Sequence, residues 1–371
     1  MNPLTTPAPL NPRGTPAINA GRRRLLGVGA AFPGEAVSTG ALCQQVRQQL
    51  GIPLPRYLTM LSTRLDVQQR HLCRDFVQAH EQPRPGARNP ELAARALHNA
   101  LGQAQLPSHA LGYLISHTAT PARQLPGGSG EIAHLLRYPG AHVELRQACT
   151  GFANALQLAF ALTAAPDSAP VAIVGVETGS VFFDPHCSHA DISQWVNFLQ
   201  MGDGAAGVII GADTPGCTQG PWISHAFFGQ LQDPPASGLV LGAGGSDCPH
   251  ASGPIRFEHD FKSVETHGAA LLEAGRDLLL SAGFDVHRAS RVVPHQASGA
   301  VAAWLAKRWD LAPELICNHA RQVGNLGSAS LWAALHDSLQ TPTQSPAGTA
   351  PMLFLGAEAT QYSYGGFALE F

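Results

Sequence analysis

The sequence predicts a layered α/β protein made of two similar halves. Its 371 residues are 44% hydrophobic and 13% charged, which is enough apolar material for one large core or two fused ones. Short apolar runs alternate along the chain with longer segments of helical period, and this alternation is typical of layered α/β folds. The order of the elements repeats after residues 213–220, although the residues themselves do not. We therefore expect two fused halves that meet there.

The first half, residues 22–213, follows a tail over residues 1–21 that we expect to be disordered, because it is rich in Pro, Asn and Thr and lacks periodicity. The run LLGVGAAF at 25–32 predicts a strand. Apolar residues at three- and four-residue spacing behind a proline predict a helix at 90–104. The other expected elements of this half are strand 111–119, helix 130–138, strand 142–145, helix 151–165, and strands 171–178 and 204–212.

The second half, residues 214–371, opens with a segment rich in Gly, Pro and Ser. We expect a hairpin and loops over 213–260 for that reason. The rest of the half repeats the alternation of the first. Its expected elements are helix 263–284, a strand ending in RVVPHQ, helices 298–311 and 327–339, and strands 351–357 and 365–371.

Charge and cysteine usage exclude several classes of protein. The formal net charge is −3, and no basic run is longer than Arg22-Arg23-Arg24, so a nucleic-acid-binding surface is not expected. Seven cysteines without a CxxC pair fit neither a disulfide framework nor a zinc ribbon, and they indicate a reducing, cytoplasmic compartment. The apolar run after the three arginines is short for an export signal, and no stretch approaches the ~18–20 apolar residues of a membrane span.

Cys149 lies in the stretch VELRQACTGFANAL, residues 143–156, between a predicted strand and a predicted helix. The N-terminal end of a helix lowers the pKa of a thiol and offers free N–H groups to an oxyanion. This position therefore indicates a nucleophile. For any one cysteine considered alone, a buried and inert role is the alternative.

Two further motifs place polar side chains beside predicted elements. His295 ends the strand in VVPHQAS, at the carboxyl edge where α/β folds build their sites. Asn325 stands in the glycine-bracketed turn VGNLGSAS, where the backbone allows close approach of a ligand. A structural histidine and a helix-capping asparagine are the alternatives.

Together these motifs resemble the thiolase-fold condensing enzymes, and most of all the β-ketoacyl-[acyl carrier protein] synthase III (KAS III) group. The resemblance runs in order from about Arg22 to Phe371. It is carried by four motifs: Ala148-Cys149-Thr150-Gly151-Phe152, Gly202-Asp203-Gly204-Ala205-Ala206, Pro294-His295-Gln296-Ala297-Ser298 and Gly324-Asn325-Leu326-Gly327-Ser328-Ala329-Ser330.

This resemblance implies a five-layered thiolase-like fold and a catalytic set of Cys149, His295 and Asn325. In that chemistry the cysteine takes an acyl group from a thioester, and the acyl-enzyme then condenses with a malonyl or β-ketoacyl thioester in fatty-acid or secondary-metabolite biosynthesis. The histidine and asparagine stabilise the negative charge that develops on the thioester oxygen. The resemblance further implies acyl carrier protein or CoA thioesters as substrates, a homodimer, and no metal or redox cofactor.

Where the sequence departs from the family pattern, the departures fall on expected substrate contacts. Leu125 stands where chain-initiating members often carry Phe, in the loop expected to floor the partner's acyl pocket, so we expect a medium or long acyl donor. An arginine expected to bind CoA aligns near Trp195, and the family's glycine-rich C-terminal turn aligns with 359–361. The expected substrate-binding residues are Leu125, Phe152, Trp195, Ser298 and Thr360.

Other interpretations stay open. One keeps the fold and Cys149 but transfers the acyl group to a hydroxyl or amine without decarboxylation, and another is a non-catalytic partner subunit. The segment 184–193 contains His186, Cys187, His189 and Asp191, which are too crowded for the usual zinc spacing. We interpret this segment as a surface or pocket loop, and we assign no role to Glu358.

Overall fold

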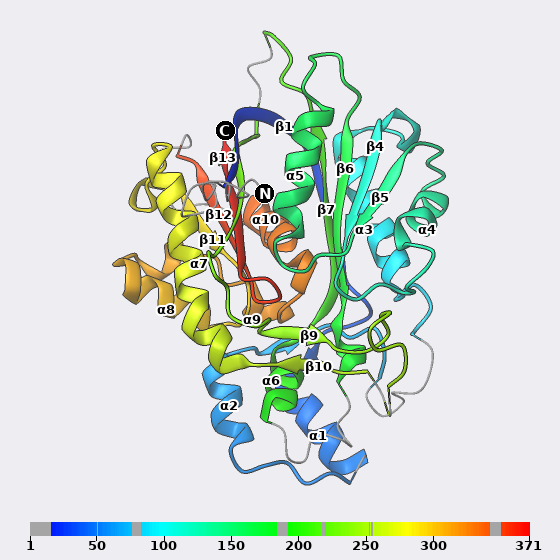
Figure 1. The fold of residues 1–371 in the computed structure, drawn as a ribbon, viewed down its shortest axis with the longest axis vertical. Coiled ribbons are helices and arrows are strands. Elements are labelled where there is room, and N and C mark those ends of the chain that lie inside the picture. The colour runs from blue at the N-terminus through cyan, green and yellow to red at the C-terminus, as the bar shows by residue number, and fades with distance from the viewer. Residues whose placement is uncertain are drawn as a thin grey trace, which may run out of the picture.

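The computed structural model describes residues 16–49, 51–75, 83–183, 192–216, 220–251, 253, 255–341 and 350–371. Figure 1 shows these residues in five layers that alternate helices and strands. One outer layer consists of α3 (Asn89–Ala104) and α4 (Gly128–Leu135), and the other contains α7 (Phe261–Ser281) and α8 (Ala300–Trp309). The middle layer contains α5 (Gly151–Leu162) and α10 (Ser330–Gln340), which pack between the two groups of strands.

The strands of the first half form a five-stranded arrangement. Its order is β5-β4-β6-β7-β1, and β7 runs antiparallel to both of its neighbours whereas β4 is parallel to β5 and β6. In chain order this is 3-2-4-5-1. The strands are β1 (Ala17–Ala31), β4 (Tyr113–His117), β5 (His142–Leu145), β6 (Val171–Thr178) and β7 (Asp203–Gly211).

The second half repeats this order. Its strands β8 (Trp222–Gln230), β11 (Arg291–Pro294), β12 (Met352–Glu358) and β13 (Ser363–Glu370) lie in the order β11-β12-β13-β8, with β13 antiparallel to its neighbours. A parallel bridge from Ile316 to Val292 occupies the place of the missing third strand. Both halves therefore have the same strand order. This agrees with the order of strands and helices that repeats along the sequence. The division into domains near residue 213 stays a prediction.

Strand β1 joins the two halves into one nine-stranded sheet. Residues 17–24 pair with β8 and residues 24–31 pair with β7. The register shifts in both pairings, and such bulges bend a strand and increase its twist. Residues 17–21 were expected in a disordered tail, and this was wrong because pairing with β8 extends the strand back to Ala17. Residues 1–15 lie outside the described residues.

The segment 213–260 also departs from the expectation of a hairpin and loops. A small hairpin-like pair is present, β9 (Leu239–Leu241) with β10 (Phe257–His259), but β8 is a nine-residue strand inside the main sheet. The glycines and prolines around β8 conceal it in the sequence. Its buried side chains show that long-range pairing, rather than local composition, decides this strand.

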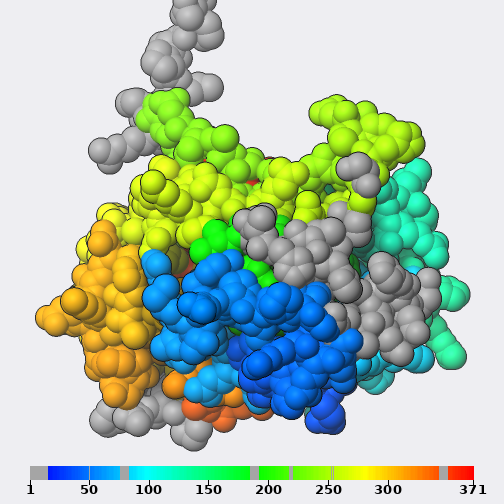
Figure 2. Space-filling model, turned by 90° about the horizontal axis from the view of Figure 1, so that it is seen from below, coloured from blue at the N-terminus to red at the C-terminus, as the bar shows by residue number. Residues whose placement is uncertain are grey.

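The remaining elements form a cap at one end of the layers. They are β2 (Val37–Ser38), α1 (Thr39–Gln49), α2 (Leu58–Leu65), β3 (Gln69–Arg70), α6 (Ile192–Gln200) and α9 (Ala320–Val323). The first part of this cap, coloured blue, covers the face seen in Figure 2. A separate hydrophobic cluster around Trp195 and Phe198 of α6 holds it to α1 and α2.

Candidate active site

The nucleophile loop, residues 146–150, connects β5 to α5 and carries Cys149. The N–H of Gly151 donates to the carbonyl of Ala148 at 3.0 Å, and the N–H of Ala153 donates to the carbonyl of Thr150 at 2.9 Å, so the chain turns directly into the helix. Cys149 is partly exposed and makes no disulfide. This is the strand-to-helix position that the sequence predicts.

Glycine is required where this loop enters the helix. A Cβ atom at Gly151 would lie 2.6 Å from Nδ1 of His117, a buried residue of β4. Nε2 of His117 accepts from the indole N–H of Trp332 in α10 at 3.2 Å. The middle layer and β4 therefore meet directly beneath the nucleophile loop.

The pKa of Cys149 is shifted in the direction opposite to the one that the sequence suggests. Burial raises the pKa of this thiol well above its ordinary value, and the carboxylates of Glu358 and Glu177 raise it further. The backbone N–H of Cys149 acts in the other direction but is outweighed. The expectation that the helix N-terminus lowers this pKa was wrong, because burial, and after it the two nearby carboxylates, outweigh that effect. The resting group is therefore a thiol.

The histidine turn, residues 294–297, follows β11. The backbone N–H of His295 donates to the carbonyl of Leu355 at 2.7 Å, and Nε2 of Gln296 donates to the carbonyls of Pro294 and Cys317 at 2.7 and 3.2 Å. Burial lowers the pKa of His295 to about 4, so its imidazole is neutral near pH 7. Its Nδ1 is buried without a hydrogen-bond partner among the described residues.

The asparagine turn, residues 324–329, lies between α9 and α10. Gly324 has a φ of +76°, a conformation that favours glycine. Oδ1 of Asn325 accepts from the N–H of Gly327 at 2.9 Å and from the hydroxyl of Ser330 at 3.4 Å. The side-chain oxygen is thus committed to the turn. The Nδ2 group, which has no partner within the described part of the chain, remains available as a donor.

Hydrogen bonds connect the three segments. The hydroxyl of Ser328 in the asparagine turn donates to the carbonyl of Gln147 in the nucleophile loop at 3.2 Å. Thr150 of the nucleophile loop bonds to Glu358 at the end of β12, and the histidine turn bonds to β12 as well. The structure therefore brings the predicted catalytic residues onto one connected unit at the carboxyl ends of β6, β11 and β12.

The Gly-Asp-Gly motif has a structural place. Asp203 is buried at the start of β7, where its carboxylate accepts from the N–H groups of Cys73 and Ser180 at 2.7 and 3.0 Å. These bonds fix the start of β7, which lies beside the asparagine turn. The N–H of Gly202 donates to the carbonyl of Asn325 at 3.0 Å. The motif thus supports the position of Asn325.

Two of the expected substrate-binding residues belong to hydrophobic cores. Phe152 is fully buried and packs edge-on against Trp332 and Phe367. Trp195 is also fully buried, and it packs against Phe183 and Phe198 in the cap. Their surroundings favour packing roles over contact with a substrate.

The other three expected contacts differ in exposure. Leu125 is 86% exposed on the loop between β4 and α4, so its side chain is not buried against the described part of its own chain. Ser298 is nearly buried just before α8. The hydroxyl of Thr360 donates to Glu358, close to the nucleophile loop. Glu358, which had no expected role, thereby becomes part of the site. Its signal in the sequence is a charged residue at the end of an apolar strand.

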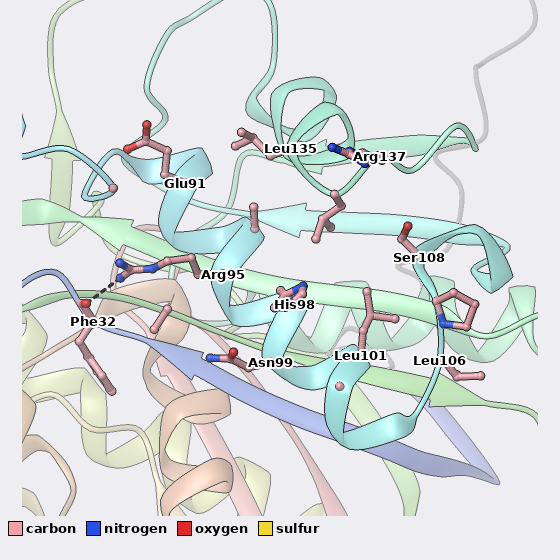
Figure 3. Close-up of a pocket in the computed structure, with 16 residues that line it drawn as sticks. Phe32, Glu91, Arg95, His98, Asn99, Leu101, Leu106, Ser108, Leu135 and Arg137 are labelled. Atoms are coloured by element: carbon pink, nitrogen blue, oxygen red, sulfur yellow. Dashed lines mark hydrogen bonds between the residues drawn. The ribbon is translucent and has the colours of Figure 1, made fainter.

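A surface groove along α3 is separate from this site. Figure 3 shows it lined by Arg95, His98 and Asn99 of α3 and by Leu135 and Arg137 near α4. Arg95 donates to the carbonyl of Phe32 at 2.7 Å at one end of the groove. None of the expected catalytic or substrate-binding residues lines it.

Metal-ligating side chains and membrane-spanning helices are the subject of two further expectations. The interval 184–191 lies outside the described residues, so the expected loop with His186 and Cys187 is not described. Elsewhere in the described ranges there is no group of three or more metal-ligating side chains. Within those ranges, too, no helix is both long and apolar enough to cross a membrane.

Comparisons with known proteins relate the chain to one group of enzymes. The family model described as 3-oxoacyl-[acyl-carrier-protein (ACP)] synthase III matches residues 143–225, and the model of that enzyme's C-terminal part matches residues 279–370. A β-ketoacyl-[acyl-carrier-protein] synthase III of Nitratidesulfovibrio vulgaris (strain DP4) is 27% identical over 75% of this chain and 81% of its own. A 3-oxopimeloyl-[acyl-carrier-protein] synthase of Rhodothermus marinus is 28% identical over 90% of this chain and 89% of its own.

Solved structures have the same fold. AbyA1, a tetronic acid condensing enzyme, superimposes with a TM-score of 0.78 at 22% identity, covering 94% of this chain and 100% of its own. The 3-oxoacyl-(acyl carrier protein) synthase III of Pseudomonas aeruginosa gives 0.74 at 24% identity, covering 95% and 98%. The chain is a thiolase-fold condensing enzyme. Within that class it is KAS III-like, and it is therefore an acyltransferase.

Proposed function

We propose that Cys149 carries an acyl group and that the enzyme condenses it with a malonyl or β-ketoacyl thioester. The observation that carries this proposal is the hydrogen-bonded connection of the nucleophile loop, the histidine turn and the asparagine turn. A thiol, a neutral imidazole and a free carboxamide N–H at one place suit acyl transfer through a thioester.

In the first step the sulfur of Cys149 attacks the carbonyl carbon of an acyl thioester. The thiol proton passes to the neutral imidazole of His295 and then to the departing thiolate, which leaves as a free thiol. The acyl group remains on Cys149 as a new thioester. The pKa of about 4 leaves the ring of His295 unprotonated at neutral pH, which a proton acceptor requires.

In the second step a malonyl thioester loses CO2, and the resulting carbanion attacks the acyl-enzyme. His295 and Nδ2 of Asn325 donate to the thioester oxygen as it becomes negative. Each such donor typically contributes ~3–4 kcal/mol to transition-state stabilisation. The bond between sulfur and acyl carbon breaks, and the Cys149 thiolate that leaves takes a proton from solvent.

The finer parts of the proposal concern substrate and assembly. We assign a medium or long acyl donor on a CoA or acyl carrier protein thioester, and a cytoplasmic homodimer in which each Leu125 contributes to its partner's acyl pocket. The 86% exposure of Leu125 supports this assembly, since a leucine so exposed gains from burial in an interface.

The test is to incubate the protein with a series of acyl-CoA and acyl-carrier thioesters and to follow the mass of the Cys149 peptide. Malonyl thioester is then added, and CO2 release and the product are measured. Acylation followed by CO2 release supports condensation. Discharge by an alcohol or amine without CO2 release favours simple acyl transfer, and no acylation favours a non-catalytic subunit.

A further inference from the structure

Two buried carboxylates occupy equivalent places in the two halves of the fold. Glu177 lies at the end of β6, which is the fourth strand of the first half in chain order. Glu358 ends β12, which has the same place in the second half when the Ile316 bridge is counted as the third strand. Their side chains are among the buried polar groups, at 4% and 2% exposure.

Each carboxylate binds the turn before the middle-layer helix of the opposite half. Glu177 accepts the N–H and the hydroxyl of Ser328 at 3.0 and 2.8 Å. Glu358 accepts the N–H and the hydroxyl of Thr150 at 2.8 and 2.6 Å. A threonine of the carboxylate's own half adds a further bond, from Thr120 to Glu177 and from Thr360 to Glu358. The arrangement is thus reciprocal, with one carboxylate beside each of the two loops that carry Cys149 and Asn325.

The carboxylate of Glu358 decides which backbone N–H groups of the nucleophile loop are free. The N–H of Thr150 donates to Glu358, and the N–H of Gly151 donates to Ala148. The N–H of Cys149 lies beside its own sulfur and has no other hydrogen-bond acceptor among the described residues. With the Thr150 N–H bound to Glu358, the N–H of Cys149 is left as the free backbone donor beside the sulfur.

We propose that Glu358 is a positioning residue for Cys149, whose carboxylate fixes the nucleophile loop through the N–H and hydroxyl of Thr150. Its negative charge also favours the thiol over the thiolate. The sulfur then loses its proton only as it attacks, when the proton passes to His295. This last step and the effect of positioning on acylation rest on the proposed function, whereas the effect of charge on the free thiol does not.

The charged groups around the sulfur determine the pH dependence. Glu358 of β12 and Glu177 of β6 are the charged side chains that raise the pKa of Cys149. His117 of β4 stands against Gly151 at the end of the loop, and His295 lies in the histidine turn after β11. Burial lowers the pKa of these two rings to about 3 and about 4. Both rings are neutral above pH 6, so after removal of Glu358 the charged group that still raises the pKa of Cys149, among the described residues, is Glu177.

The first experiment measures alkylation of Cys149 by iodoacetamide between pH 8 and 12, a range chosen because the pKa of this thiol is raised well above its ordinary value. Alkylation is read as the modified Cys149 peptide by mass spectrometry. Glu358→Gln keeps the shape of the side chain and removes its charge. We expect the midpoint of the profile to move to lower pH by about one unit, because a like charge near the thiolate is lost. An unchanged midpoint in a variant that keeps the thermal stability of the parent overturns the charge effect.

The second experiment separates geometry from charge. Thr150→Val removes the hydroxyl that Glu358 accepts, and Thr150→Ser retains it as the matched control. We expect the valine variant to keep the alkaline midpoint but to react with acyl thioester about tenfold more slowly than the serine variant. The valine lacks the hydroxyl that bonds Glu358, Ser363 and Gln147, and the serine keeps it. Equal rates for the two variants overturn the positioning role, including in the case that Glu358→Gln fails to fold.

Failure of the proposed function is distinguishable from failure of this inference. Alkylation needs no acyl substrate, so a shifted midpoint in a protein that no thioester acylates sustains the role of Glu358 and overturns acyl transfer. Acylation of the parent protein together with an unshifted alkylation midpoint in Glu358→Gln supports acyl transfer and overturns the charge effect of Glu358.

Discussion

The indole N–H of Trp332 donates to Nε2 of His117, 215 residues away in the sequence, directly beneath the helix that starts after Cys149. The imidazole in turn stands against Gly151, where a Cβ atom would approach Nδ1 to 2.6 Å. The entry to α5 is thus confined by a residue of β4 and a residue of α10. This contact couples the packing of the middle layer to the position of the nucleophile.

Gly151→Ala tests that coupling. We expect a loss of ~1–3 kcal/mol in the free energy of unfolding, because the added methyl group forces the imidazole or the helix to move. The matched control is Gly268→Ala in α7, where nothing lies within 4 Å of the new Cβ and alanine favours the helix by ~0.5–1 kcal/mol. Urea denaturation measures both, and equal stability of the two variants contradicts the confinement.

Asn325→Ala tests the donor role of the carboxamide. We expect the rate of condensation to fall by about 10²–10³, since one donor to the developing oxyanion is removed. Acylation of Cys149 in the absence of malonyl thioester should fall much less, because that step is assigned to Cys149 and His295. Single-turnover measurements give the rates of acylation and of condensation separately. An equal decrease in both rates contradicts the donor role and assigns Asn325 only to holding the turn.

The buried histidines predict a dependence of stability on pH. Burial lowers the pKa of His117 to about 3 and of His295 to about 4, below the value of about 6.5 in an unfolded chain. Below pH 6.5 the unfolded state therefore binds more protons, and stability falls as the pH decreases from 6.5 towards 4. Thermal unfolding at intervals over pH 5–7.5 measures this.

His117→Gln supplies the comparison for that series, because it removes one titrating group. We expect its melting temperature to decrease less steeply with falling pH than that of the parent. Parallel curves for the two proteins contradict the assignment to His117. Glu177 and Asp203, whose pKa values burial raises, act in the opposite direction in both proteins.

Leu125→Phe tests the proposed partner pocket. We expect the acyl chains that load onto Cys149 to become shorter, since a larger side chain reduces the depth of the pocket to which the partner's loop contributes. Leu280→Phe is the matched control, because Leu280 is 54% exposed on α7, away from the loop between β4 and α4. Competition between acyl-CoA chain lengths, read as Cys149 adducts, measures the preference. The same chain-length profile in both variants contradicts a role for Leu125.

Most regular elements were predictable because their signals are local. The helix expected at 90–104 is α3, the strand at 171–178 is β6, and the alternation of apolar runs identified the layered class. The cap helices α1, α2 and α6 were not predicted, since their apolar residues are partners for one another across more than 100 positions. Trp195 was expected at a substrate and lies in that core for the same reason.

The sequence by itself determined the fold class and the three motifs that carry Cys149, His295 and Asn325, because those patterns lie within stretches of a few residues. Only the tertiary structure decided the surroundings of the sulfur. Glu358 and Thr150 are 208 residues apart, and Glu177 and Ser328 are 151 apart, so no local pattern relates them. Their meeting depends on equivalent strands of the two halves ending at a common layer. Burial and these two carboxylates together raise the pKa of Cys149, which the sequence analysis expected to be lowered.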